Sequence, residues 1–128
     1  MEIKRADTTP YEKGDAGRFT GSVWLNPGIS TPDGTSVVQV SFEPGSRTHW
    51  HQHPGGQFVA VVAGRGRIAS RDEGTVQDIV PGDIVFAPAG EWHWHGGGMD
   101  TPMAHVAVNG GGAPEWGEPV TDEEYLGS

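Results

Sequence analysis

Three of the six histidines in this chain stand at alternate positions, at His49, His51 and His53. Alternate side chains of a β-strand project to the same face, so an extended segment here would bring the three imidazoles together. Neutral imidazole is a common ligand of divalent first-row metal ions. The spacing therefore indicates a metal site, provided that the rest of the chain supplies further ligands.

Two turns supply those further ligands. The compact turn Pro54–Gly56 is followed by Gln57, whose side chain can come back beside His53 at the start of the next predicted strand. A second turn, Pro88–Gly90, precedes His93 in the same way. The candidate ligands are three imidazoles and one amide oxygen, from His51, His53, Gln57 and His93. Because all four are neutral, a bound divalent ion would keep its full charge and act as a strong Lewis acid.

Two other histidines could support this site or take part in catalysis. Strand alternation places His95 on the same face as His93, and it places His105 on a late strand facing inward with Ala107 and Asn109. Ligand imidazoles generally need hydrogen-bond partners, which such residues can provide. Both roles, support and proton transfer, remain open at this point.

The elements that must position these side chains are short strands joined by tight turns. The 128 residues include 21 glycines and 10 prolines, and apolar residues alternate in short blocks between them. This pattern predicts an all-β fold, an antiparallel sandwich or barrel. The predicted strands are Phe19–Leu25, Ser36–Glu43, Arg47–His53, Gln57–Ala63, Arg67–Ser70, Thr75–Ile79, Asp83–Ala87, Glu91–His95 and Met103–Asn109.

The length predicts one domain over residues 1–128. Its barrel core is expected at about residues 36–109, between an N-terminal arm (1–17) and an acidic C-terminal tail (113–128). The one helical signal is the capping box Thr121–Glu124, which predicts a single C-terminal turn.

Aromatic and apolar residues in the strands predict how they pack. Trp50, Trp92 and Trp94 alternate with the histidines, so they are expected on the opposite face, in the core or at a subunit interface. The apolar run Phe58–Val62 predicts a strand buried on both faces. The predicted edge strands and the tryptophans together favour a homodimer or a higher homo-oligomer.

Charge and composition exclude several classes of partner. The formal net charge of −9 argues against nucleic acid, whose phosphates would be repelled. No segment is apolar enough to span a bilayer, and the opening residues lack the apolar stretch of a signal peptide. There are no cysteines and therefore no disulfides. We expect a soluble cytoplasmic protein that acts on a small molecule, without nucleic acid or membrane.

The residues around the candidate ligands resemble the two cupin motifs. Residues Gly45–Gly64 have the spacing of the first motif, with Gln57 where glutamate is usual. Residues Gly82–His93 have the spacing of the second motif, and Gly97 follows where asparagine often stands. The resemblance implies a small single-domain cupin, an antiparallel β-barrel of the jelly-roll type.

Most of the chain also resembles the bacterial cupin hydroxynitrile lyases, which are manganese-dependent, (R)-selective mandelonitrile lyases. The resemblance is carried by the opening MEIKR and by the segments Phe19–Gly21, Val40–Thr48, Trp50–Gln57, His93–Gly96, Met103–His105 and Val120–Tyr125. It implies metal ligation by His51, His53, Gln57 and His93. It also implies that His105 is a pocket residue involved in proton transfer.

Two pocket positions differ from that family. His49 stands where a small apolar residue is expected, and Asn109 stands where a glutamine would lie. Both differences could change substrate preference. The predicted substrate pocket comprises Val40, His49, Ala107 and Asn109.

Three functions agree with these residues. The first is a lyase that cleaves or forms α-hydroxynitriles, in which a Lewis-acidic metal lowers the pKa of the hydroxyl and His105, or else His95, takes the proton. The second is a metal-dependent dioxygenase, although a carboxylate ligand is commoner there than Gln57. The third is a non-catalytic cupin that binds a small molecule. Mn(II) is the expected cofactor of the lyase, with Fe(II), Zn(II) and Ni(II) as alternatives.

Overall fold

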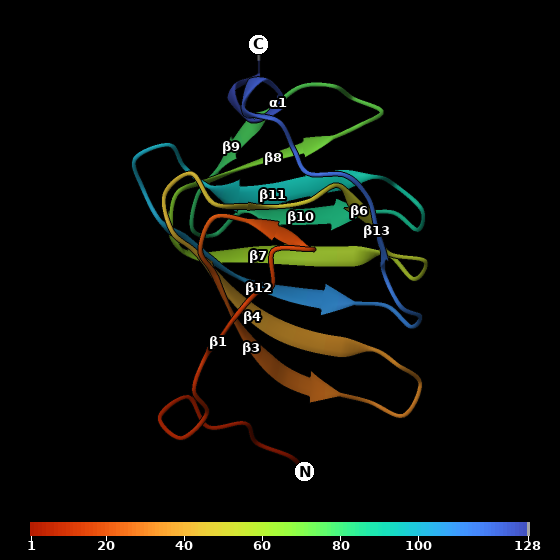
Figure 1. Ribbon diagram of the computed structural model, residues 1–128. Helices are drawn as coiled ribbons and strands as arrows, with labels where there is room; N and C mark the ends of the chain where they lie inside the picture. Colours follow the sequence, from red (N-terminus) through yellow and green to blue (C-terminus); the bar gives the residue numbers. More distant parts are fainter. Residues whose placement is uncertain (128) are drawn as a thin grey trace.

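The structure, a computed structural model, describes residues 1–127. Antiparallel strands form two curled sheets that face each other, which confirms the predicted all-β class (Figure 1). The first sheet contains, in spatial order, β1 (Glu12–Lys13), β3 (Val23–Ser30), β4 (Ser36–Phe42), β12 (Met103–Asn109), β7 (Gln57–Gly64) and β10 (Ile84–Ala87). The second contains β13 (Glu115–Trp116), β6 (His51–Gln52), β11 (His93–Gly97), β5 (Arg47–Thr48) and β2 (Phe19–Thr20), with β8 (Gly66–Ser70) paired to β11 and β9 (Gln77–Ile79) paired to β8.

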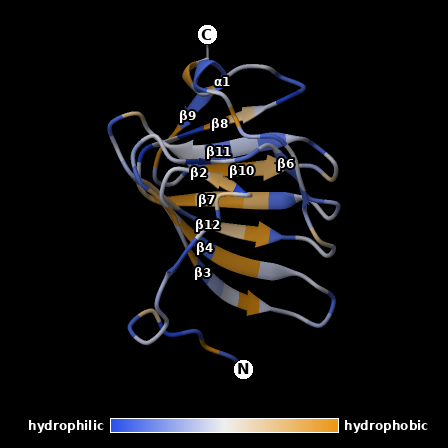
Figure 2. Ribbon diagram, viewed as in Figure 1, coloured by the Kyte–Doolittle hydropathy of each residue, from blue (hydrophilic) through white to orange (hydrophobic). Residues whose placement is uncertain are grey.

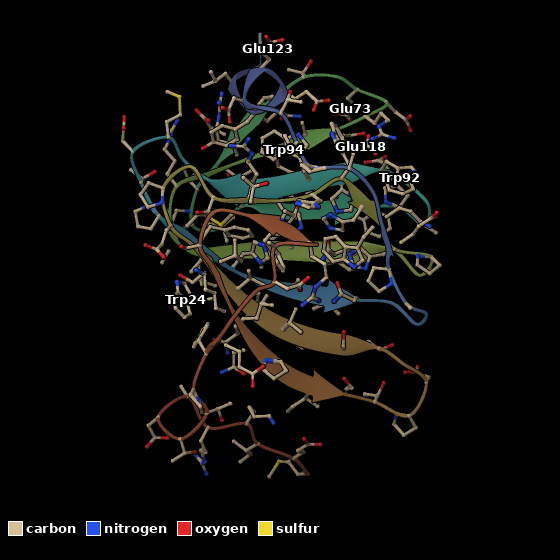
Figure 3. The ribbon with its side chains drawn as sticks, viewed as in Figure 1. Trp24, Glu73, Trp92, Trp94, Glu118 and Glu123 are labelled. Atoms are coloured by element: carbon tan, nitrogen blue, oxygen red, sulfur yellow. The ribbon has the colours of Figure 1, made fainter. Side chains whose placement is uncertain are left out.

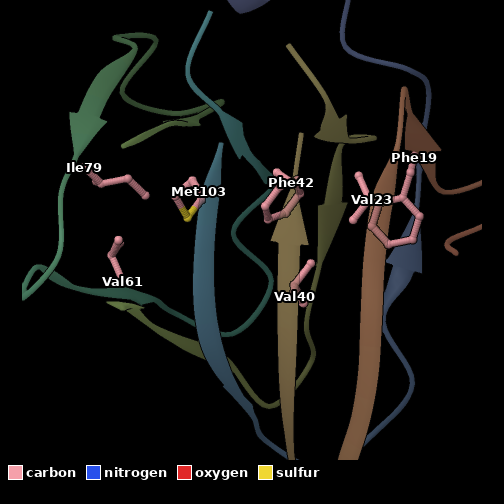
Figure 4. Packing of buried hydrophobic residues seen from close by; sticks show 7 residues of the cluster. All are labelled: Phe19, Val23, Val40, Phe42, Val61, Ile79 and Met103. Carbon is pink, nitrogen blue, oxygen red and sulfur yellow. The ribbon is translucent and has the colours of Figure 1, made fainter. Parts of the chain in front are cut away.

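A hydrophobic core lies between the two sheets. Alternation along β4 turns Val40 and Phe42 inward, and both are buried. The core comprises Phe19, Val23, Val40, Phe42, Val61, Ile79 and Met103 (Figure 4). Burying each large apolar side chain contributes about 1.5–3 kcal/mol, so this cluster holds the sheets at a fixed spacing.

A second cluster covers the outer face of the second sheet. Trp50 and Trp94 lie there with Tyr125, as predicted from their alternation with the histidines; Figure 3 shows Trp94 between β11 and α1 (Asp122–Leu126). The capping box at Thr121 is present and starts this single helix, and the Tyr125 hydroxyl donates to the carbonyl of Gly97 at 2.7 Å. Among the described residues, no helix is long and apolar enough to cross a membrane.

One predicted strand is interrupted at the centre of the proposed site. The segment Arg47–His53 divides into β5 and β6, because the amide of His49 donates to the carbonyl of Arg18 at 2.8 Å and that of Trp50 to Glu118 at 3.0 Å. These partners belong to distant segments, so His49 and Trp50 do not form the regular backbone hydrogen bonds of a β-ladder. The prediction of one continuous strand is therefore wrong here. His49 lies between the two strands, so strand alternation no longer places it on the same face as His51 and His53.

The structure also differs from the predicted strand Phe19–Leu25, which divides into β2 and β3, and β3 runs on to Ser30. The pairing of β3 with β4 shifts register between Asn26 and Ile29, just beyond the predicted end of the strand. Gly28 has a φ of 63°, and a Cβ there would approach the carbonyl oxygen of Val37 closely. The glycine therefore permits a bulge inside a strand rather than a chain reversal.

The outer face of the first sheet is open to solvent in the described residues. Phe58 is 50% exposed and Val62 is 57% exposed, so the prediction that this run is buried on both faces is wrong for the single chain. Neighbouring Ile84 and Phe86 on β10 are 74% and 55% exposed. Figure 2 shows β7 as apolar along most of its length. This open face is apolar.

Candidate metal centre

The pairing of β6 with β11 brings the first two candidate ligands together. His51 and His93 are directly paired across these strands, and their ring centroids lie 4.4 Å apart. His53 follows β6 at the start of the turn. One ring nitrogen each of His51, His53 and His93 lies within 4.8 Å of the others, and all three residues are buried. The cluster can hold a divalent metal ion, as is typical of such histidine groups.

Hydrogen bonds to the backbone fix the protonation of two of these rings. The Nδ1–H of His51 donates to the carbonyl of His49, and that of His93 donates to the carbonyl of Glu91, each at 2.9 Å. Because a carbonyl oxygen can only accept, Nδ1 carries the proton and Nε2 keeps a lone pair. The lone pairs of these rings are thus available to a cation.

Gln57, the first residue of β7, lies beside this cluster. Its Oε1 lies 2.9 Å from Nε2 of His93. When Nε2 is unprotonated, both atoms are acceptors, and two acceptors at this distance repel unless a cation lies between them. The donor set therefore fits a positive ion.

His53 gives an independent indication. Both of its ring nitrogens are buried and have no hydrogen-bond partner among the described residues. Leaving a buried polar group unpaired costs about 1–3 kcal/mol, so such a group needs an explanation. A bond from one of these nitrogens to a metal ion provides one.

Burial keeps the three imidazoles neutral at physiological pH. It lowers the pKa of His93, lowers that of His51 well below its usual value, and lowers that of His53 to about 4. For His51 and His53, the repulsion that a protonated His93 would exert lowers the pKa further. Metal binding requires deprotonated ligands. These rings therefore need not release a proton to bind a cation near pH 7.

A cavity of about 320 Å³ is lined by three of these four donors, His51, His53 and Gln57, whereas His93 lines a neighbouring cavity. Apolar and aromatic side chains also form its walls, namely Phe19, Leu25, Val38, Val40, Ala107 and Trp116, and further imidazole and amide groups come from His95, His105 and Asn109. The predicted pocket residues Val40, Ala107 and Asn109 line it, whereas His49 does not. The cavity can therefore hold a molecule with an apolar body and a polar group directed at the histidines.

His95 and His105 form a buried pair beside the candidate ligands. Nε2 of His105 lies 3.0 Å from Nδ1 of His95, and both residues line the cavity. The remaining nitrogens, Nε2 of His95 and Nδ1 of His105, have no partner among residues 1–127. Burial lowers the pKa of His105 to about 4 and that of His95 well below its usual value. The pair is neutral near pH 7, and each ring keeps one nitrogen that makes no hydrogen bond within the described residues.

Sequence reasoning missed several residues of the cavity. Trp116 stacks on His51, with ring centroids 4.6 Å apart and planes at 24°, although 65 positions separate them. Arg18 in turn lies over the Trp116 ring. Nothing local in the sequence links Trp116 to His51. Val38 could have been found, since it stands two positions before Val40 on the same strand.

Histidine burial predicts acid sensitivity of the metal-free protein. The folded-state pKa of His105, about 4, lies below the unfolded value of 6.5, so the unfolded chain binds more protons between these limits. The stabilisation is complete above pH 6.5 and is lost as the pH falls toward 4, with a loss of about 2 kcal/mol at pH 5 from this residue alone. Urea unfolding at pH 7.5 and pH 5 measures the loss. The His105→Phe variant should lose about 2 kcal/mol less, and an equal loss in both proteins would contradict the prediction.

Comparison with known proteins gives matches over nearly the whole chain. A family model described as Cupin domain matches residues 38–109. The (R)-mandelonitrile lyase of Granulicella tundricola is 47% identical over 130 residues, covering 98% of each protein. The crystal structure of a cupin-like protein from Thermotoga maritima superposes with a TM-score of 0.85 at 36% identity, covering 95% of each chain. The polyketide cyclase RemF of Streptomyces resistomycificus has the same fold, with a TM-score of 0.76, 21% identity and coverage of 98% of this chain and 90% of that one.

Proposed function

This chain belongs to the cupin family, and we propose that it is a metal-dependent lyase that cleaves or forms α-hydroxynitriles. The observation that carries the proposal is the 47% identity, over 98% of both proteins, to an (R)-mandelonitrile lyase. The fold alone would not suffice, because cupins support unrelated activities. The site adds chemical support through its neutral donors, its apolar cavity and its buried histidine pair.

The proposed metal ligands are His51, His53, Gln57 and His93. We propose Mn(II) as the ion, with Fe(II), Zn(II) and Ni(II) as alternatives that the same imidazole and amide donors can bind. When bound, a divalent ion supplies a Lewis acid that lowers the pKa of a nearby hydroxyl group. The four side chains add no negative charge that would weaken this effect.

His105 is the proposed general base, and one of the two directions of its hydrogen bond to His95 leaves it a lone pair for this role. If Nε2–H of His105 donates to Nδ1 of His95, then Nδ1 of His105 has a free lone pair. A pKa of about 4 keeps this imidazole neutral but makes it a weak base, so it suits a hydroxyl whose own pKa is lowered. His95 acts through this hydrogen bond and is the alternative base.

In the proposed cleavage, His105 accepts a proton from the substrate and later returns it to the leaving cyanide. Nδ1 of His105 takes the hydroxyl proton of the cyanohydrin, and the released electron pair forms the carbonyl double bond. The carbon–carbon bond to the nitrile breaks, and cyanide leaves with that bond's electron pair. The His105 imidazolium then returns the proton to cyanide. The products are an aldehyde and hydrogen cyanide, with no oxidant needed.

The cavity supports an aromatic or compact apolar substituent on the substrate. At about 320 Å³ it lies near the lower end of the range for small-molecule pockets, which begins at about 300 Å³. Val40 and Ala107 form part of the apolar wall of the cavity, and Val40 is paired with His105 across β4 and β12. The cavity walls can surround one ring while the hydroxyl group points to the histidines.

Two assays on one sample separate the lyase from the dioxygenase. Incubation with racemic mandelonitrile and Mn(II) should release benzaldehyde faster than a metal-stripped control. The same protein should consume no oxygen with a panel of catechols and flavonols. Oxygen uptake without cyanohydrin cleavage would favour the dioxygenase, and tight small-molecule binding without turnover in either assay would favour a binding protein.

We also propose that the protein forms a homodimer and that it acts in the cytoplasm. The open face of the first sheet supports the dimer, because a large exposed apolar surface is typical of a protein interface. On this face the ring centroids of Phe58 and Phe86 lie 4.7 Å apart, and Ile84 beside them is exposed as well. Light scattering should give twice the chain mass, and Ile84→Asp should halve it. A monomeric wild type would refute the dimer, and fractionation of source cells tests the location.

A further inference from the structure

A row of three polar side chains crosses the first sheet beside the candidate metal centre. The strand register pairs Ser36 of β4 with Asn109 of β12, and Asn109 with Gln57 of β7. Side chains paired in this way project from the same face, with Cβ atoms about 5 Å apart. The strand register therefore places the amide of Asn109 next to Gln57 and the hydroxyl of Ser36 next to Asn109.

Hydrogen bonds join this row from end to end. Nε2 of Gln57 donates to Oδ1 of Asn109 at 2.9 Å, and Nδ2 of Asn109 donates to Oγ of Ser36 at 3.2 Å. Oε1 of Gln57 then faces Nε2 of His93. The amide thus turns its oxygen toward the candidate ligands and its nitrogen away from them.

We infer that Asn109 is a positioning residue that makes Gln57 a metal ligand by giving its amide nitrogen an acceptor; the inference rests on the proposed metal site. A glutamine amide can rotate by 180° and exchange its oxygen and nitrogen. In the rotated form, Gln57 would donate to the unprotonated Nε2 of His93 and compete with the metal. Oδ1 of Asn109 favours the unrotated form, because rotation would turn the Gln57 oxygen toward Oδ1 of Asn109 and leave two buried acceptors facing each other without a donor.

The acceptor can be removed with a side chain that branches at the same carbon. Asn109→Leu has no acceptor, whereas Asn109→Asp keeps an oxygen in the same place. Outer partners of metal ligands contribute about 10- to 100-fold to affinity, so Asn109→Leu is expected to weaken Mn(II) binding about tenfold. Asn109→Asp should bind Mn(II) at least as tightly as the wild type. Electron paramagnetic resonance of free Mn(II), recorded during titration of metal-free protein, measures this without any turnover.

Gln57→Glu provides the matched control. Both terminal atoms of a carboxylate are oxygens, so rotation of the group has no consequence. In the Gln57→Glu background, Asn109→Leu should therefore leave Mn(II) affinity unchanged. An equal loss in both backgrounds would show that leucine merely disturbs the sheet, and no loss in the wild-type background would equally overturn the inference. A wild-type protein that takes up no Mn(II) would instead refute the metal site itself, and the role of Asn109 with it.

Discussion

Alanine at His51, His53 or His93 is expected to lower metal occupancy and reduce lyase activity by more than about 100-fold. Each substitution removes one of the three nitrogens that lie within 4.8 Å of one another. The remaining donors are neutral and provide no carboxylate charge to offset the loss of a bond. Elemental analysis of protein purified without chelators measures occupancy, and benzaldehyde release measures activity.

His49→Ala is the matched control for this series. His49 is also a buried histidine, and it stands two positions before His51, but it is not one of the three histidines whose ring nitrogens lie within 4.8 Å of one another. The variant should therefore retain its metal. Full metal content in all three ligand variants would exclude this group as the metal centre.

The second large effect is expected at His105. Its Nδ1 lacks a partner, and its Nε2 bonds to His95, so His105→Phe removes the proposed base while keeping a ring of similar shape in the buried site. Positioned general bases contribute about 10²- to 10⁴-fold, and we expect a loss in kcat within that range. The ring is outside the ligand group, so metal content should stay at the wild-type level.

The pH profile of the residual activity distinguishes a base from a packing residue. If His105 takes the proton, the variant should lose most of its kcat at every pH, and its rate should rise with hydroxide concentration instead. A variant with wild-type kcat would assign the proton transfer to His95 or to solvent. A variant that loses its metal would show that His105 supports the site structurally.

Local patterns in the sequence predicted much of the fold. Alternation along Met103–Asn109 turned His105 and Ala107 inward, as the structure has them, because β12 is a central strand that pairs with β4 in unbroken register. The capping box at Thr121 started the single helix as expected, since its hydrogen bonds are local. The spacing within the two cupin motifs also brought the four proposed ligands together, although their role in binding metal stays a prediction.

Features that depend on distant partners could not be predicted in this way. The backbone of Arg18 breaks the strand before His51, and Trp116 stacks on His51 from the far end of the chain. The exposure of Phe58 depends on whether another layer covers the sheet, which its own apolar character cannot reveal. The pairing of Asn109 with Gln57 similarly depends on strand register.

Stepwise addition of metal tests the central claim most directly. Protein stripped by a chelator should release benzaldehyde from racemic mandelonitrile no faster than buffer does. On titration with Mn(II), the rate should rise in proportion to the metal added and level off at one ion per chain, as a single group of His51, His53, Gln57 and His93 requires. Stripped protein that cleaves mandelonitrile as fast as the fully loaded protein would contradict a metal-dependent lyase.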